Sequence, residues 1–595
     1  MLQPGSRLTL IDAMRPPAGF TLDAAMAVTF TLDLRALLAA PAAFALAGSE
    51  GVTKDGTGQE PIELLHAVKS NASKLTVFSQ VGEIGLPPSR PVFAFLEQAV
   101  VPVLAPRGGV VHPKVWVMRY APSAQDGSAP RLRVLIASRN LTFDASWDTV
   151  VRLDESIAGK GADLSPLSDL FEGLLAQKAG ASPSHHARVE HLSAALRAAK
   201  FALPVGVKSM NLSVLGLENT DSPLPLDADR SLIISPFLSA DFFTDVRPGR
   251  VDAVVSRPES LDGLDAAVLP QLGVTYQFDD GSIFDPDDDD KRSSQDPARP
   301  ITGLHAKVFA FEQGSTARLF LGSANATSAA FTSNVEVLLE LKGSVEQLGI
   351  DQLFGGSDDE PGLNALFMPY TPISGQGPDP GLGGLDGARR AVARIDIEGV
   401  VEASGAGFAV TYRSVEPVPT VEDITIECWP LSSPGNRRTV AMGEPLELRF
   451  ETTVELISGF LAFCITHADG TITEFVVPSQ LSNVPEERDS LLLKALVGNA
   501  ERFLQYLLAL LDEDPARADL LDAVEVAYTG EATNGDHTPV LPVLEKLIRT
   551  MRRDPAKLAS LQPLVADLAA DNALPPGFHD LWATITEVAL PEGSS

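Results

Sequence analysis

The chain has 595 residues, an apolar content of 45% and a formal net charge of −32 at neutral pH. Its length and dispersed charges predict a globular protein of several domains. The acidic balance argues against a protein that coats nucleic acid by unspecific attraction, and no apolar run is long enough to span a membrane.

The first 200 residues mix strand-like runs with helical patterns. The segment 160–200 has amphipathic spacing, which is typical of helices. The most apolar segment, 34–48, contains Pro41 and lies well inside the chain, so it is predicted to be a buried helix rather than a signal peptide. The strand-like runs are 27–34, 74–81, 101–106, 111–118 and 131–138.

One predicted strand carries His112 and Lys114, and the next strand ends in Ser138-Arg139-Asn140. Alternate residues of a strand point to the same face, so His112 and Lys114 project side by side. An imidazole can attack phosphorus or protonate a leaving oxygen, because its pKa lies near neutrality. Lysine and asparagine side chains donate to phosphate oxygens. These residue types predict half of a site for phosphate chemistry.

The surroundings of this motif are locally cationic, since 107–152 holds more basic than acidic residues. Such a field would attract a phosphodiester within an acidic chain, although strand alternation would equally place some of the arginines on a solvated face. Asp148 is the nearest carboxylate that could orient a histidine in this half. The alternative is an aspartate in a surface turn beside Trp147.

Strand patterns resume at 231–238, 252–261 and 273–278, and the same motif then recurs. The second copy consists of His305, Lys307 and the run 322–325, which contains Ser323 and Asn325; Glu336 follows it. This recurrence indicates an internal duplication. We expect the two halves to meet, so that two histidines, two lysines and two asparagines surround one phosphate.

An acidic segment, 279–290, leads toward the second motif. It is interpreted as a solvated loop or, alternatively, as a plug that occupies the cationic cleft in place of substrate. It lacks the glycine and the final glutamate of a calcium-binding EF-hand loop.

The duplicated H-x-K…S-x-N pattern resembles the phospholipase D superfamily, whose members cleave phosphodiesters through a covalent phosphohistidine without a metal ion. The resemblance covers 1–345. Arg119 and Glu312 stand where an aspartate usually follows each H-x-K. This form is closer to the branch of tyrosyl-DNA phosphodiesterases and certain restriction nucleases, which puts lipase activity in doubt more than phosphodiester cleavage.

The resemblance implies an α/β fold with two pseudo-symmetric α/β/α repeats, and it implies neither a cofactor nor a metal. It makes His112 the nucleophile and His305 the general acid, although the two-fold arrangement allows the reverse. Glu336 matches the downstream glutamate that orients a histidine. The expected catalytic residues are His112, His305, Lys114, Lys307, Asn140, Asn325 and Glu336, and the expected substrate contacts are Ser138, Ser323, Arg139 and Asp148.

The remaining chain changes character twice. Short strands between turns predict a small β-sandwich, and leucines at helical spacing follow it. Cys428 and Cys464 are the only cysteines, which suits a reducing cytoplasm and offers no zinc site. The predicted domains are 1–200 and 201–345 (the two repeats), 346–393 (a linker rich in Gly, Pro and Asp), 394–482 (the β-sandwich) and 483–595 (a helical domain).

The sequence therefore predicts a metal-independent bacterial nuclease that cleaves DNA or RNA in the cytoplasm. Its carboxy-terminal domains would bind a partner, such as a helicase in antiphage defence, or would only buttress the core. Two alternatives stay open: a phospholipid phosphodiesterase, and a catalytically silent scaffold that binds nucleic acid.

Overall fold

The structure is a computed structural model. It describes residues 10–45, 71–122, 128–143, 146–178, 181–217, 221–279, 303–355, 362–373, 383–405, 407–489, 491–492, 565 and 578–589. The acidic segment lies outside the described residues except for Asp279, and so does most of the predicted helical domain. No described helix combines the length and the apolar character needed to cross a membrane.

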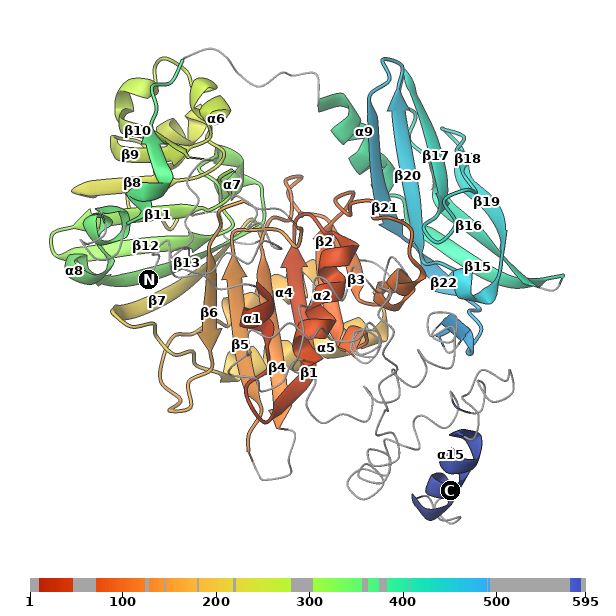
Figure 1. Ribbon diagram of the computed structural model, residues 1–595. Coiled ribbons are helices and arrows are strands. Elements are labelled where there is room, and N and C mark those ends of the chain that lie inside the picture. Colours follow the sequence, from red (N-terminus) through yellow and green to blue (C-terminus); the bar gives the residue numbers. More distant parts are fainter. Residues whose placement is uncertain are drawn as a thin grey trace, which may run out of the picture.

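A six-stranded sheet forms the first half of the molecule, with the strand order β3-β2-β1-β4-β5-β6 (Figure 1). β1, β2 and β3 run parallel, and β4, β5 and β6 continue the sheet antiparallel. The strands are β1 (Phe20–Thr29), β2 (Leu75–Gln80), β3 (Val100–Val103), β4 (Val115–Pro122), β5 (Arg131–Ala137) and β6 (Val150–Asp154).

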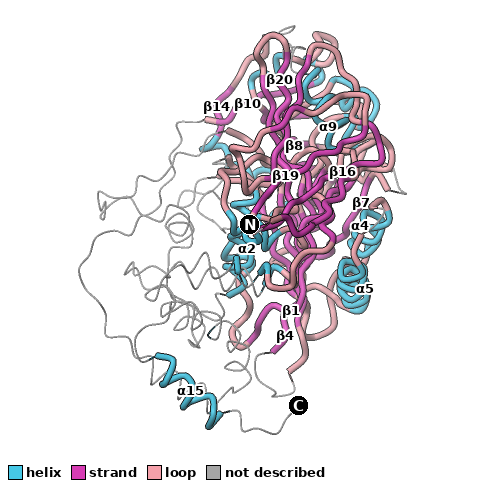
Figure 2. The backbone as a smooth tube through the Cα atoms, turned by 90° about the vertical axis from the view of Figure 1, so that its right-hand side faces the viewer, coloured by secondary structure: helices cyan, strands magenta, loops and turns pink. Residues whose placement is uncertain are grey.

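Helices cover both faces of this first sheet (Figure 2). α1 (Leu10–Met14) and α2 (Leu34–Ala45) pack on one face, together with the 3-10 turn η1 (Pro91–Leu96). α4 (Pro166–Ala176) and α5 (Pro183–Ala198) pack on the other. Each face has its own apolar cluster because alternate strand residues point to opposite sides.

The predicted buried helix is confirmed as α2, but the strand run predicted at 27–34 was placed too late in the chain. β1 ends at Thr29, and the chain then turns into the helix. Asp33 explains the switch, since its carboxylate accepts the Arg35 N–H at 2.8 Å and so caps the start of α2.

An eight-stranded sheet follows, with the order β14-β10-β9-β8-β11-β12-β13-β7. β8, β9 and β10 run parallel, and β11, β12 and β13 continue antiparallel, so the central six strands repeat the order and directions of the first sheet. The strands are β7 (Val207–Leu215), β8 (Arg230–Ile234), β9 (Val251–Ser256), β10 (Leu272–Phe278), β11 (Val308–Gln313), β12 (Thr316–Gly322), β13 (Glu336–Ser344) and β14 (Phe367–Pro369).

Part of the segment predicted to be a linker is regular structure instead. β14 pairs with β10, and α9 (Gly383–Ala393) packs on two later strands, β20 (Phe460–His467) and β21 (Ile472–Pro478). Phe367 explains the ordering of β14, since its ring is buried and meets Trp147 edge-on at a centroid distance of 5.8 Å. Because 346–393 is rich in Gly, Pro and Asp, its composition predicts a loop and does not reveal the few apolar residues that hold this segment in place.

Residues 397–482 form two four-stranded sheets that share one apolar cluster. Cys428 and Cys464 are free thiols that belong to different apolar clusters. The first sheet consists of β15 (Ile397–Ser404), β16 (Gly407–Pro417), β19 (Pro445–Thr452) and β22 (Gln480–Ser482), and the second of β17 (Ile424–Pro430), β18 (Arg438–Thr439), β20 (Phe460–His467) and β21 (Ile472–Pro478). Beyond them, the described part of the predicted helical domain includes α15 (Phe578–Ala589).

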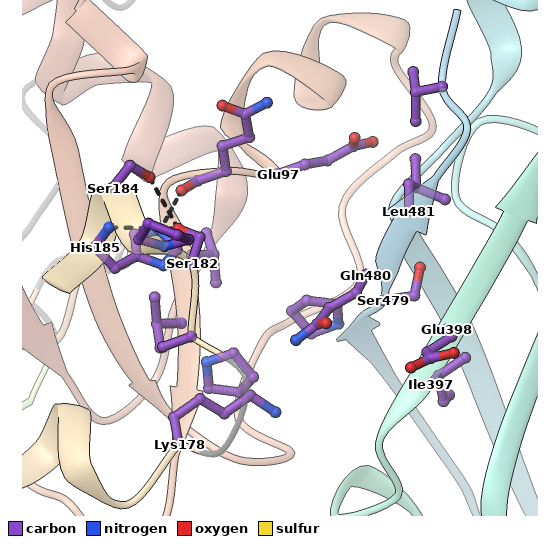
Figure 3. A pocket seen from close by; sticks show the side chains of 18 of the residues that line it. Glu97, Lys178, Ser182, Ser184, His185, Ile397, Glu398, Ser479, Gln480 and Leu481 are labelled. Atoms are coloured by element: carbon purple, nitrogen blue, oxygen red, sulfur yellow. Dashed lines mark hydrogen bonds between the residues drawn. The ribbon is translucent and has the colours of Figure 1, made fainter.

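These C-terminal sheets lie against the β3 edge of the first sheet (Figure 1). The Val476 N–H donates to Ile84 at 2.9 Å, and a buried ion pair joins Glu97 to Arg488. A cavity of about 950 Å³ lies along this junction, and Figure 3 shows the side chains that line it. Glu97 and His185 line it from the first half, and Ile397 from the C-terminal sheets. The cavity is separate from the two H-x-K segments, which do not line it.

Candidate active site

The two H-x-K segments lie where the two large sheets meet. The His112 N–H donates to the carbonyl of Val335 at 3.0 Å, and the His305 N–H donates to the carbonyl of Trp147 at 2.9 Å. Each histidine is therefore anchored by the opposite half of the molecule. One composite site results, as the duplicated motif predicts.

The carboxylate of Glu336 contacts the imidazole of His112. Its Oε2 atom lies 3.0 Å from Nδ1 of His112, and it also accepts the hydroxyl of Ser323. The Glu336 side chain is 0% exposed. Burial opposes its ionisation, but the neighbouring His112 and Lys114 and the Ser323 hydroxyl outweigh burial and lower its pKa. A carboxylate only accepts, so Nδ1 of His112 carries the hydrogen, and Nε2 keeps its lone pair.

Burial lowers the pKa of His112 to about 4, so its ring is neutral near pH 7. The carboxylate of Glu336 opposes this shift, while the ammonium groups of Lys114 and Lys307 reinforce it. The Phe30 ring packs 5.3 Å from the imidazole, measured between centroids. A neutral imidazole with an available Nε2 lone pair is the nucleophilic form.

His305 has the opposite arrangement of donor and acceptor. Its Nδ1 lies 3.2 Å from Nζ of Lys307, and an ammonium group can only donate. Nδ1 therefore accepts, and the neutral ring carries its hydrogen on Nε2. Burial and the charge of Lys307 hold the pKa of His305 well below its usual value. The two histidines thus differ chemically, since one offers a lone pair at Nε2 and the other a proton.

Both lysines are buried beside these rings. Lys307 is 0% exposed, and its Nζ donates to the carbonyl of His305 at 2.6 Å. Lys114 donates to the carbonyl of His112, and burial together with the charge of Lys307 lowers its pKa well below the usual range. Two cations held close together in an apolar surrounding repel each other. An anion between them would relieve that repulsion.

The sequence predicts substrate contacts for Ser138 and Ser323. In the structure both hydroxyls bond to the backbone of a neighbouring strand, and that of Ser323 also donates to Glu336. The Ser138 hydroxyl accepts the Thr149 N–H at 2.8 Å, and the Ser323 hydroxyl accepts the Val337 N–H at 3.0 Å. Both serines are buried. They hold the strand ends that carry the asparagines, because each hydroxyl ties two neighbouring strands together.

Asp148 and Glu336 occupy matching positions in the two halves. Asp148 directly precedes Thr149, which bonds to Ser138, and Glu336 directly precedes Val337, which bonds to Ser323. Asp148 forms an ion pair with Arg139 at 3.6 Å, where both side chains are partly exposed. The chain spacing hides this equivalence, since the two carboxylates lie at different distances from their asparagines.

Asn140 and Asn325 repeat one feature in both halves. The Oδ1 atom of each is buried and has no hydrogen-bond partner among the described residues. A buried unpaired acceptor costs free energy, and a phosphate could be bound only through the Nδ2 donors of these amides.

Two pairs of supporting residues are absent from the motif. The first pair bonds to the residues that directly follow the asparagines. The Thr29 hydroxyl accepts the Leu141 N–H at 3.0 Å, and the Ser235 hydroxyl accepts the Ala326 N–H at 2.9 Å. Their signal in the sequence is only a hydroxyl residue at or just after the end of β1 and β8, which many strands share.

The second pair bonds to the residues that directly precede the two histidines. The Gln80 amide oxygen accepts the Val111 N–H at 2.8 Å, while Arg257 donates to the carbonyl of Leu304 through two nitrogens at 3.1 and 2.9 Å. Gln80 ends β2, and Arg257 follows β9 directly. At this matching position the first half therefore has a neutral side chain and the second half has a cation.

The residues at the usual aspartate position serve the fold. Glu312 is buried, and its carboxylate accepts the Ile350 N–H at 2.7 Å. Arg119 forms an ion pair with Asp23. Among the described residues, no three His, Cys, Asp or Glu side chains gather in a group that could hold a metal ion.

No protein-family model matches the chain, and no curated protein matches it. Among solved structures, the chain is similar to mutants of the yeast tyrosyl-DNA phosphodiesterase. One of them is 11% identical with a TM-score of 0.35, over 59% of this chain and 90% of that one. Polyphosphate kinase from Porphyromonas gingivalis is 11% identical with a TM-score of 0.28, over 54% and 40% of the two chains. Any function therefore rests on the geometry of the site itself.

Proposed function

We propose that the protein is a metal-independent phosphodiesterase of the phospholipase D type, built from two pseudo-symmetric repeats, that acts on nucleic acid. The observation that carries this proposal is the contact of Glu336 with Nδ1 of His112, which joins a carboxylate of one half to a histidine of the other. It creates an oriented nucleophile beside two buried lysines.

The first step is in-line displacement at phosphorus. The Nε2 lone pair of His112 forms a P–N bond while the bond to the leaving oxygen breaks. His305 gives its Nε2 proton to that oxygen. Because Nδ1 of His305 accepts from Lys307, the Lys307 ammonium is placed to protonate Nδ1 as the Nε2 proton leaves.

The second step returns the enzyme to its starting state. Water attacks the phosphohistidine, and Nε2 of His305 takes the proton of that water. The Nδ1 proton then returns to Lys307, and the P–N bond breaks to regenerate His112. Lys114, Lys307 and the amides of Asn140 and Asn325 would stabilise the negative charge of both transition states, which is the task that a metal ion performs in other nucleases.

Arg119 and Glu312 replace the usual motif aspartates, which favours nucleic acid over phospholipid as the substrate. Arg139 and Arg257 flank the two motifs in a chain that is acidic overall. A helicase partner and a role in antiphage defence stay predictions, as does cytoplasmic location.

The test is cleavage of labelled DNA, RNA and phosphatidylcholine in the presence of EDTA, with the His112→Ala protein alongside. Cleavage of DNA or RNA that disappears in His112→Ala supports the proposal. Release of choline without nucleic-acid cleavage would favour the lipid alternative. Binding of nucleic acid without cleavage of any substrate would favour the silent scaffold.

A further inference from the structure

Phe237 is an exposed aromatic ring held in a fixed position. Its side chain is 46% exposed, and the guanidinium carbon of Arg257 lies 5.0 Å from the ring centroid. The Ser235 hydroxyl donates to the Phe237 carbonyl at 2.8 Å, which fixes the backbone beneath the ring. Such a ring loses little conformational freedom when a planar ligand stacks on it.

This aromatic–arginine pair adjoins the His305 side of the site. Arg257 donates twice to Leu304, the residue before His305. Leu238, the residue after Phe237, forms a β-bridge with Ala326, the residue after Asn325. Both members of the pair are thus tied to the backbone beside a residue of the site.

The other half differs at the matching position. Gln80 stands in place of Arg257, is almost fully buried and carries no charge. The two halves therefore differ at this position, with a cation on the His305 side and a neutral amide on the other. Under the proposed function, His305 protonates the leaving oxygen, so the leaving group occupies this side.

We propose that Phe237 and Arg257 form the subsite for the leaving group and that this group is a nucleotide. The ring would stack on its base, and the guanidinium would contact its further phosphate. A choline leaving group is cationic, so Arg257 would repel it. The inference rests on the proposed function and narrows its substrate class.

The chain offers a matched control in Phe143. This ring is 45% exposed and lies 6.0 Å from the guanidinium carbon of Arg35, but it follows Asn140 in the first half. Substituting Phe143 removes an equally exposed, arginine-associated ring from the first half of the molecule.

The experiment compares three substrates: a thymidine dinucleotide with terminal phosphates, and the same molecule with either one of its two sugars abasic. A radiolabel that remains on His112 after denaturation identifies the non-leaving nucleotide. Stacking on an aromatic side chain contributes enough that Phe237→Ala should lower kcat/KM for the complete dinucleotide by about 5- to 150-fold. The substrate that is abasic on the leaving side should lose almost nothing.

Phe143→Ala should leave this preference for a leaving base intact. Equal losses on the complete and the abasic substrates, or the same selective loss in Phe143→Ala, would overturn the inference. So would release of choline from a choline phosphodiester at the rate of nucleotide release. The test substitutes Phe237 and not Arg257, because loss of Arg257 would also remove its hydrogen bonds to Leu304.

A failure of the proposed function looks different. In that case the parent protein cleaves none of the phosphodiesters, or His112→Ala still cleaves them. The subsite is then tested without turnover, by fluorescence anisotropy of the labelled dinucleotide on His112→Ala protein. Weaker binding after Phe237→Ala, and not after Phe143→Ala, supports the subsite; unchanged binding rejects it.

Discussion

Oε2 of Glu336 lies 3.0 Å from Nδ1 of His112, although Glu336 begins β13 of the second sheet and His112 precedes β4 of the first. The contact makes the two halves depend on each other for one oriented imidazole. It also gives the most direct test of the site.

Glu336→Gln should lower kcat by about 10²- to 10⁴-fold, as neutralising the carboxylate of a serine-protease triad does. An amide can donate as well as accept, so it no longer holds the hydrogen on Nδ1 of His112. Steady-state kinetics would measure the loss. Glu340→Gln is the control, because Glu340 lies on the same strand and pairs with Arg318. A Glu336→Gln protein as active as this control would contradict the role.

His112→Ala and His305→Ala should each abolish turnover of a substrate with a poor leaving group, and the double variant should be no worse than either. Residues that act as a unit give non-additive losses. Single-turnover assays would show this, with the exposed His186→Ala as control. Near-normal cleavage by either single variant would mean two independent sites.

With a p-nitrophenyl ester, whose leaving group needs no acid, His305→Ala should accumulate a phosphohistidine. The intermediate builds up because His305 also activates the water that hydrolyses it. Mass spectrometry should locate the phosphoryl adduct on His112, and His112→Ala should show none. An adduct on another residue would require a different nucleophile.

The acid limb of kcat/KM should lie near pH 4 rather than near 6.5, since burial lowers the pKa of His112 to about 4 and the nucleophile must be neutral. The same shift affects folding. Between pH 6.5 and 4 the unfolded chain binds a proton that the folded protein does not, so stability falls as the pH falls through this window. Thermal unfolding of the parent and of His112→Asn should show a shallower fall in the variant.

Cleavage should persist in EDTA, because lysines and histidines supply the charge and the protons. Gel assays with and without chelator would measure this. Activity that vanishes with EDTA and returns with Mg²⁺ would contradict the mechanism.

Arg488→Ala should destabilise the protein by about 3–5 kcal/mol, because it leaves the Glu97 carboxylate buried without its cation. Glu97 accepts Arg488 at 2.9 Å and the Gly459 N–H at 2.6 Å, across the junction with the C-terminal sheets. Urea unfolding would measure the change, and adding Glu97→Gln should recover part of it. The exposed Arg437 pairs with Glu474, so Arg437→Ala should cost at most about 1 kcal/mol.

The sequence by itself determined the parts of the site that depend on local geometry. Residues two apart on a strand share a face, which predicted each histidine beside its lysine. The pairs do lie together, but both H-x-K segments end just before β4 and β11 and not within a strand. The recurrence of the motif predicted two related units, and the two large sheets have the same strand order at their centres. Each of these inferences needs only strand periodicity and repetition along the chain.

Only the tertiary structure decided which group contacts which across the two halves. Glu336 contacts His112, Asp148 takes the matching place beside Arg139, and Arg257 replaces the neutral Gln80. The tautomer of His112 follows from the contact with Glu336, since a carboxylate accepts, whereas that of His305 follows from its local contact with the ammonium of Lys307. Residues so far apart in the chain are brought together by the packing of two sheets, and no periodicity along the sequence encodes that packing.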